Sequence, residues 1–259
     1  MSTASSPDLS PISLAAGLLV LAYLLIGEPV WGRVAYARLR RDRAADPLAL
    51  VRLYRLTVLV EWPLAAAVLA MVALDPGIDA AGLGLVWPSG ARTGTVAGMV
   101  AAASAGAVIG AVVVRRAAAK GQTVPGTEAV EAMLPRTRRE RWWALAVAVT
   151  AGVCEELLYR GFLIALFAAL GLPVRAAAVA ALAVFAVGHV YQGARGVAGV
   201  TVLGALFTGA YLLSGSLLPG IWLHVLVDVR GLLFTPPPVG GPPVGGVDYP
   251  AGNEASGGR

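Results

Sequence analysis

Three ionisable residues lie within six positions of one long apolar segment. The segment 155–160, with the sequence EELLYR, lies inside an apolar run over 142–170. An ionised side chain at the centre of a membrane helix costs about 2.5–3.5 kcal/mol on insertion scales, so these groups need partners or a water-filled cavity. The two histidines of the chain, His189 and His224, lie in two later apolar segments. This arrangement predicts a chemically active site at membrane depth.

The spacing within the EELLYR segment predicts different functions for its two carboxylates. Glu156 and Arg160 are four positions apart and therefore share one face of a helix, where an ion pair is expected. Glu155 is rotated by about 100° from Glu156 and points elsewhere. One carboxylate can thus be held by Arg160 as a structural anchor while the other faces a cavity as a base.

Two further pairs have the same four-residue spacing, Phe185 with His189 and His224 with Asp228. A carboxylate and two imidazoles around a water molecule suit peptide hydrolysis, because the carboxylate takes a proton from the water and later delivers it to the leaving amine. One histidine can orient that water or bind a metal that activates it, and another donor can stabilise the oxyanion. Taken singly, each residue is equally consistent with a helix–helix hydrogen bond or an internal strut. Together they favour one shared site.

The composition is typical of a multi-pass membrane protein. The chain is 58% hydrophobic and 14% charged, whereas a soluble domain has about 25% charged residues. The net charge of +5 comes mainly from arginines concentrated in the segments 33–55 and 115–141. By the positive-inside rule both segments face the cytoplasm. No segment is long enough for an extramembrane nucleic-acid-binding domain, so nucleic acid is not expected as a partner.

The apolar segments predict an all-α, polytopic transmembrane helical bundle with about seven spans. They cover about 12–31, 56–74, 94–114, 142–170, 172–190, 198–213 and 217–234. Alternation from the basic segments places the N-terminus outside and the C-terminus in the cytoplasm, in the plasma membrane. The predicted regions are N-terminal transmembrane helices with basic loops over 1–133, a core over 134–234, and a disordered Pro/Gly-rich tail over 235–259.

The fourth apolar segment has readable ends. Thr137 and Glu140 match a capping box, and Gly171 supplies a stop, so a helix over 138–170 is predicted. Such a helix is about 50 Å long, against an apolar core of about 30 Å, so it must tilt, bend or project.

Other spans carry features interpreted as packing or interface. Glycines and an alanine recur every four residues over 98–110, which predicts a ridge for close helix–helix approach. Glu61 is interpreted as a carboxylate reaching the membrane interface rather than as a site residue. Gly188 is expected to let another backbone approach beside His189.

The two histidines are expected at different depths. Counted from the outer ends of their spans, His189 lies about 26 Å deep and His224 about 10 Å deep. The predicted site closes if the 214–216 turn is buried, or if the helices tilt and shift.

Three motifs in this order resemble the CAAX prenyl protease and bacteriocin-processing (CPBP) family, also called the ABI family. They are Glu-Glu-x-x-x-Arg at 155–160, Phe-x-x-x-His at 185–189 and His-x-x-x-Asp at 224–228. The flanking RGFL at 160–163 and LPRT at 134–137 are also similar to that family. The resemblance covers about residues 134–229 and implies a CPBP-type α-helical intramembrane protease core.

The resemblance also implies roles for the motif residues. Glu155 is the implied general base on water, helped by His189. His224 and Asp228 would contribute to the oxyanion site or to water positioning. The pair formed by Glu156 and Arg160 would hold the geometry. Eukaryotic members often have Asn at the position of Asp228, and a carboxylate is a poorer oxyanion donor, so Asp228 could instead orient His224.

The sequence does not decide between a metal cofactor and no cofactor. The family has been called both metal-dependent and glutamate-dependent. A metalloprotease would hold zinc on His189 and His224, with Glu155, whereas a glutamate-dependent enzyme needs no cofactor. No His-Glu-x-x-His motif is present in the sequence.

The expected function is that of an intramembrane endopeptidase, a hydrolase acting on a peptide or protein substrate within the lipid bilayer. One alternative is a non-catalytic membrane scaffold or bacteriocin-immunity protein. Another is a proton-coupled transporter, since carboxylate and histidine relays occur inside membranes. A transporter would predict paired broken helices in two related halves, and the sequence shows no such symmetry.

Overall fold

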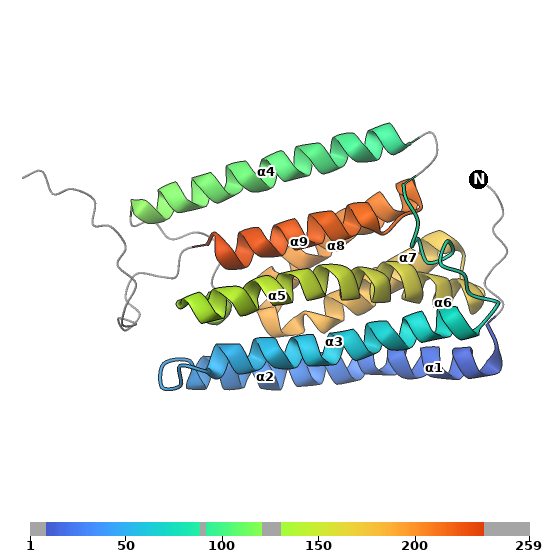
Figure 1. Ribbon diagram of the computed structural model, residues 1–259, viewed down its shortest axis with the longest axis horizontal. Helices are drawn as coiled ribbons and strands as arrows, with labels where there is room; N and C mark the ends of the chain where they lie inside the picture. Colours follow the sequence, from blue (N-terminus) through green and yellow to red (C-terminus); the bar gives the residue numbers. More distant parts are fainter. Residues whose placement is uncertain (1–8, 89–91, 121–130, 236–259) are drawn as a thin grey trace, which may run out of the picture.

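A computed structural model describes residues 9–88, 92–120 and 131–235 of the 259-residue chain. These residues form helices joined by short connections, and the long rods lie side by side (Figure 1). In order, the elements are α1 (Pro11–Ala22), η1 (Tyr23–Gly27), α2 (Glu28–Asp42), α3 (Ala49–Leu74), α4 (Thr93–Ala119), η2 (Glu131–Met133), α5 (Arg138–Glu155), η3 (Glu156–Leu163), α6 (Ile164–Ala169), α7 (Val174–Gly188), η4 (Val190–Gln192), α8 (Gly193–Ser214) and α9 (Leu218–Leu233).

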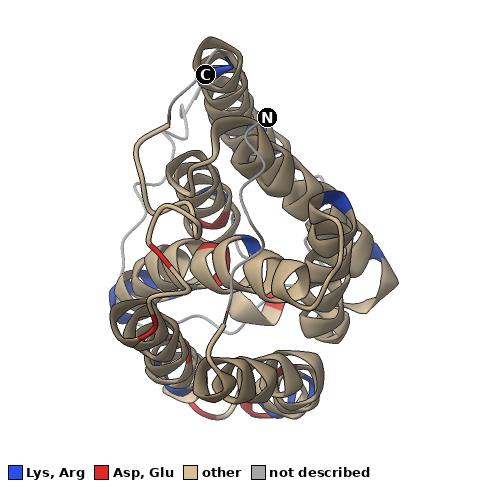
Figure 2. Ribbon diagram, turned by 90° about the vertical axis from the view of Figure 1, so that its right-hand side faces the viewer, with Lys and Arg blue, Asp and Glu red and all other residues tan. Residues whose placement is uncertain are grey.

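The prediction of a polytopic helical bundle is confirmed. Four helices of the described chain are long and apolar enough to cross a membrane: Pro11–Asp42, Ala49–Leu74, Thr93–Ala119 and Val190–Ser214. The helix Val174–Gly188 is apolar but shorter, and α9 has 16 residues. The rod formed by α5, η3 and α6 carries the EELLYR segment. The end-on view shows acidic positions between the helices as well as at the periphery (Figure 2).

Several helix ends differ from the predicted boundaries. The first rod continues to Asp42 and α3 begins at Ala49, so the predicted basic loop over 33–55 is reduced to a turn over 43–48. The sixth segment, predicted as a short span over 198–213, is the 22-residue helix Gly193–Ser214. The helices continue through basic residues because Arg is a good helix former and is favoured near a helix C-terminus.

The predicted start of the fourth rod is confirmed. The Thr137 hydroxyl accepts a hydrogen bond from the Glu140 amide, and the Glu140 carboxylate accepts one from the Thr137 amide, at 3.2 and 3.1 Å. Arg43, in the turn after α2, adds a buried ion pair to Glu140 at 2.7 Å. The rod runs through η3, a π-helical turn, and stops at Gly171 with φ +94°. This ion pair links the turn between α2 and α3 to the start of α5.

The helices α5 and α9 cross closely at a glycine. A Cβ on Gly152 would lie 2.4 Å from Val225 Cγ2 and 3.0 Å from Val225 N. No side chain fits there unless α9 moves. This contact lies one helical turn from Glu155 on one helix and next to His224 on the other, so it sets the distance between two predicted site residues.

The predicted glycine ridge on α4 packs differently from the expectation. A Cβ on Gly98 or Gly106 would meet no described atom within 4 Å, and one on Gly110 would lie 3.1 Å from the Arg230 side chain. The close helix–helix approach predicted for this ridge is therefore wrong for the described residues. Periodicity identifies residues that share a face, but it does not identify what that face contacts. Figure 1 shows α4 at the edge of the bundle, alongside α9.

The turn between α8 and α9 is buried and hydrogen-bonded to another segment of the chain. Ser214 and Ser216 are buried, and Gly215 takes a left-handed conformation with φ +67°. The Leu217 amide donates to the Gly84 carbonyl at 2.8 Å, so the connection after α3 lies against this turn. The predicted disordered tail over 235–259 lies outside the described residues, apart from Thr235.

Candidate active site

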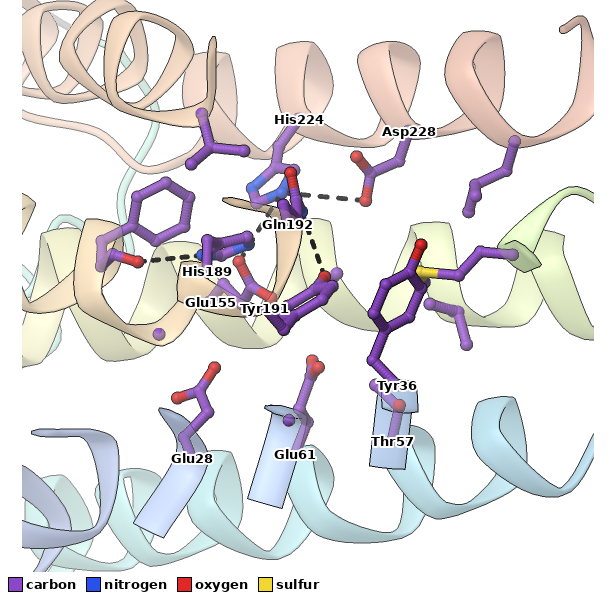
Figure 3. A pocket seen from close by; sticks show the side chains of 18 of the residues that line it. Glu28, Tyr36, Thr57, Glu61, Glu155, His189, Tyr191, Gln192, His224 and Asp228 are labelled. Atoms are coloured by element: carbon purple, nitrogen blue, oxygen red, sulfur yellow. Dashed lines mark hydrogen bonds and ion pairs between the residues drawn. The ribbon is translucent and has the colours of Figure 1, made fainter. Parts of the chain in front are cut away.

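Four of the six predicted catalytic residues line one cavity of about 190 Å³. They come from separate helices: Glu155 ends α5, His189 follows α7, and His224 and Asp228 lie on α9. Figure 3 shows their side chains converging. The two histidines were expected at different depths, yet both line this cavity. Ser214 and Ser216 in the turn between α8 and α9 are buried, which is one of the two conditions expected to bring the histidines together.

Glu156 and Arg160 form the anchor beneath this cavity. Their side chains are almost fully buried and form an ion pair, Arg160 Nη1 to Glu156 Oε1, at 2.9 Å. Arg160 also donates to the Thr208 hydroxyl at 3.4 Å and to the Gly204 carbonyl at 3.3 Å, and its guanidinium lies 4.3 Å from the centre of the Phe185 ring. The predicted intrahelical pair is present and also ties α8 to η3.

His224 is oriented by Glu156. Its Nδ1 lies 2.9 Å from Glu156 Oε1. An ionised carboxylate only accepts hydrogen bonds, so Nδ1 carries a proton in this contact. The other ring nitrogen, Nε2, faces Glu155 Oε2 at 3.7 Å and Asp228 Oδ2 at 3.8 Å. A separation of 3.8 Å is too long for a hydrogen bond, so the geometry gives the orienting contact to Glu156 rather than to Asp228.

His189 is oriented by the backbone. Its Nδ1 lies 2.9 Å from the Phe185 carbonyl, which can only accept. In the neutral ring Nε2 therefore bears the lone pair. The Phe185 ring packs on the imidazole with a centroid separation of 4.5 Å and limits its rotation. His189 is thus fixed as an acceptor for a group in the cavity.

Glu155 is the carboxylate available for chemistry. Its side chain is 11% exposed, and its Oε2 has no hydrogen-bond partner among the described residues. It lines the cavity, whereas the adjacent Glu156 does not, as the 100° rotation between neighbours predicts. Glu155 is also the last residue before the π-helical turn η3, and π-helical turns are frequent at functional sites.

Two further carboxylates line the cavity, and sequence reasoning assigned neither of them to the site. Glu28 begins α2, directly after the π-helical turn η1, and accepts a hydrogen bond from the Tyr159 hydroxyl at 2.7 Å. Glu61 on α3 has a buried Oε2 without a hydrogen-bond partner. The interpretation of Glu61 as an interface carboxylate is therefore wrong, because it lines the same cavity as Glu155. The sequence feature that could have identified Glu28 and Glu61 is that both acids lie within apolar segments.

Gly188 makes room both for side chains and for a neighbouring backbone. A Cβ at this position would lie 3.2 Å from Glu28 Oε1 and 3.3 Å from the Tyr159 hydroxyl. The backbone of α2 also approaches here, because a Cβ on Gly32 would lie 4.0 Å from the Gly188 carbonyl oxygen, as expected from the sequence. The glycine thus lets the pair formed by Glu28 and Tyr159 pack against the end of α7, beside His189.

The residues present do not fit a zinc ion as they are arranged. The described residues contain no group of three His, Cys, Asp or Glu side chains placed to hold a metal. A zinc site needs about three protein ligands at about 2.0–2.3 Å from the ion, and no such group is formed by the described residues. The metal assignment to His189 and His224, with Glu155, stays a prediction.

The fold and the site define a class of protein, a membrane-embedded helical bundle whose cavity places carboxylates beside two oriented imidazoles. Residues 137–230 match the family model described as type II CAAX prenyl endopeptidase Rce1-like. Over these residues the match confirms the resemblance to the CPBP family of CAAX-type intramembrane proteases and the predicted enzyme class, a hydrolase acting on peptide bonds. No curated protein and no solved structure matches the chain.

Proposed function

We propose that this protein is an intramembrane endopeptidase in which Glu155 activates the attacking water. One observation carries the proposal: an unpartnered Glu155 oxygen and the histidines His189 and His224, each with its Nδ1 held by a neighbouring acceptor, line the same cavity. Each histidine is thereby left with Nε2 for a substrate or a water. General acid–base catalysis requires such fixed groups within hydrogen-bond reach of the reacting atoms.

The first step is the attack of water on the peptide carbonyl. Glu155 accepts one proton from the water, and the lone pair on His189 Nε2 accepts a hydrogen bond from the second water hydrogen, which orients the oxygen. A C–O bond forms and the carbonyl becomes an oxyanion. When His224 is protonated, its Nε2 donates to that oxyanion, since Glu156 already holds Nδ1.

The second step breaks the C–N bond. Glu155 returns its proton to the leaving nitrogen, so that one product carries a free amine and the other a carboxyl group. Asp228, whose side chain is 29% exposed, lies 3.8 Å from His224 Nε2 and lines the same cavity. A carboxylate accepts rather than donates, so Asp228 would assist the oxyanion directly only in its protonated form.

We further propose that residues 134–234 form the protease core and that the helices within 1–133 complete its cavity wall. The family match over 137–230 supports the first part. The cavity lining supports the second, because Glu28 and Tyr36 on α2 and Glu61 on α3 belong to it.

The proposed location is the plasma membrane, with the N-terminus outside and the C-terminus in the cytoplasm. The basic residues at the ends of α2, α3, α4 and α5 support this orientation. The cavity lining includes Met133, which lies a few residues before the basic start of α5, and Leu232, near the end of α9. The proposed entry for substrate is therefore on the cytoplasmic side.

The test is cleavage of a quenched fluorescent peptide library by the purified full-length protein in lipid nanodiscs. Glu155→Gln should reduce the cleavage rate by about 10²–10⁴, the usual contribution of a general base. The matched control is Glu131→Gln, an exposed carboxylate outside the cavity lining, which should cleave at the wild-type rate. Wild-type activity in Glu155→Gln would refute the assignment.

The same assay run with a zinc chelator tests the cofactor. A glutamate-dependent enzyme keeps its activity in chelator. Loss of activity that zinc restores would instead support the predicted metal site on His189 and His224. Absence of cleavage in every condition would favour the scaffold or immunity alternative.

A further inference from the structure

The cavity is strongly acidic for a site at membrane depth. Its described lining includes four carboxylates and two imidazoles, and no Lys or Arg. The carboxylates are Glu28, Glu61, Glu155 and Asp228. The catalysis proposed above uses Glu155, with Asp228 beside the histidines. Glu28 and Glu61 have no function in it.

Glu28 and Glu61 form a separate wall of the cavity. They lie on α2 and α3, and Figure 3 shows both side chains pointing from these helices toward the histidines, opposite His224 and Asp228. Tyr159 donates one hydrogen bond to Glu28 Oε2. Glu61 Oε2 is buried and has no partner among the described residues.

A buried carboxylate without a partner is costly, because it loses hydration and gains no compensating contact. The described lining residues supply no cation that could pair with Glu61. A cation brought by a bound substrate would fill this deficit.

The size of the adjoining space points to a compact cation. A small side pocket of about 30 Å³ is lined by both glutamates, Glu155, Trp31 and Thr57, which also line the main cavity. A cavity of about 10–15 Å³ is enough to hold one water molecule, so this pocket has room for a group as small as an ammonium. An ammonium is a compact point charge, whereas a guanidinium is a larger planar group. The indole of Trp31 offers an apolar and aromatic surface for the aliphatic stem of such a side chain.

We propose that Glu61 and Glu28 form a subsite for a lysine ammonium of the substrate, next to the scissile bond. This inference rests on the proposed endopeptidase function and names its substrate class. Glu61 contributes an unpaired oxygen to the ammonium, and Glu28 contributes the oxygen that does not accept from Tyr159. The lysine stem then places the neighbouring peptide bond beside Glu155 and His189 on the facing wall.

The experiment compares matched quenched peptides that carry lysine or norleucine, its uncharged analogue, at each position flanking the scissile bond. Wild-type protein should cleave the preferred lysine peptide with at least about tenfold higher kcat/KM than the norleucine peptide, the range expected for a desolvated charged contact. Glu61→Gln should abolish this preference, with a smaller loss for Glu28→Gln. Glu131→Gln should keep the preference. An arginine peptide should be a poorer substrate than the lysine peptide.

Equal cleavage of the lysine and norleucine peptides by wild-type protein would overturn the subsite while leaving the endopeptidase intact. A preference that survives in Glu61→Gln would also overturn it. Glu61→Gln is close in shape to the native residue, and a melting temperature in nanodiscs equal to that of the wild type would show that it is folded.

A binding measurement separates failure of the subsite from failure of the proposed function. Fluorescently labelled lysine and norleucine peptides are titrated into Glu155→Gln protein with or without Glu61→Gln. Tighter binding of the lysine peptide only when Glu61 is present would support the subsite even if no peptide is cleaved. Equal binding of both peptides would refute it.

Discussion

At the residue scale, Arg160 is the side chain whose removal should cost most. Its guanidinium is fully buried and contacts Glu156, Thr208 and Gly204 from three directions. Arg160→Met leaves the Glu156 carboxylate buried without its cation, which should lower the free energy of unfolding by about 3–5 kcal/mol. Thermal unfolding in detergent measures this loss.

The double variant Arg160→Met with Glu156→Gln is the control for that prediction. It removes both charges together, so it should regain much of the stability lost in the single variant. A single variant as stable as the wild type would contradict the assignment of this ion pair as an anchor.

Asp228 gives a second prediction at this scale. Its carboxylate lies 3.8 Å from His224 Nε2, beyond hydrogen-bond range, and its position faces the cavity. Asp228→Asn supplies a permanent donor, so the rate of cleavage should be kept or increased. Asp228→Ala removes the group and should lower kcat by about tenfold or more, as for a missing oxyanion donor. If both variants lose activity equally, the negative charge itself is needed.

The site residues divide into those that local spacing could identify and those it could not. Glu156 and Arg160 are four positions apart, and helix geometry alone predicts their ion pair. The contact of Glu156 with His224 joins residues 68 positions apart. It depends on how η3 and α9 pack, and a single sequence does not contain that information. Glu28 and Glu61 enter the site in the same way, through the packing of α2 and α3.

At the element scale, the crossing of α5 and α9 should be intolerant of any side chain at Gly152. Its Cβ would press on the Val225 backbone and force α9 outward, which should lower stability by about 1–3 kcal/mol. The shift would also displace His224, so Gly152→Ala should lose activity. Cleavage rate and melting temperature are measured together with Gly209→Ala, a helical glycine on α8 with nothing within 4 Å of its Cβ. Wild-type activity and stability in Gly152→Ala would show that α5 and α9 can move apart at little cost, and would contradict this prediction.

The junction between α3 and α1 should be sensitive to acid. Asp75 follows α3, and hydrogen bonds from the Ser13 and Ser10 hydroxyls and from backbone amides hold the pKa of its carboxyl well below the ordinary value of 3.8. A depressed pKa means that the ionised form stabilises the fold above that value, and that this contribution is lost as the pH falls toward the folded-state pKa. Asp75→Asn should therefore be less stable at neutral pH and show a weaker decline of melting temperature below about pH 4. Parallel declines in both proteins would assign the acid sensitivity to other groups.

Helix ends with a capping box or a glycine stop were easier to predict than helix neighbours, and the reason is physical. The capping box at Thr137 and the stop at Gly171 are local contacts, encoded within a few residues. The α4 ridge was assigned a packing role from its period alone, yet Gly98 and Gly106 face no described atom. A stripe of small residues permits close approach without specifying a partner.

At the scale of the whole molecule, the charge distribution makes a prediction about orientation. Figure 1 shows the connection between α2 and α3, the end of α4, the start of α5 and the end of α9 at one end of the bundle. Arginines gather in these segments, as at Arg43, Arg116 and Arg138. The opposite end, which carries the connection after α3 with Asp75, has fewer cations. By the positive-inside rule the arginine-rich end faces the cytoplasm.

Reporter fusions test this orientation directly. A fluorescent protein that folds only in the cytoplasm should be bright when fused to the C-terminus, and alkaline phosphatase, active only outside, should be inactive there. Phosphatase inserted after Asp79, in the connection between α3 and α4, should be active. The reverse pattern would place the basic end outside. It would also move the cavity mouth, which Met133 and Leu232 line, away from cytoplasmic substrates, so the same fusions decide from which side a lysine-bearing peptide must reach Glu155.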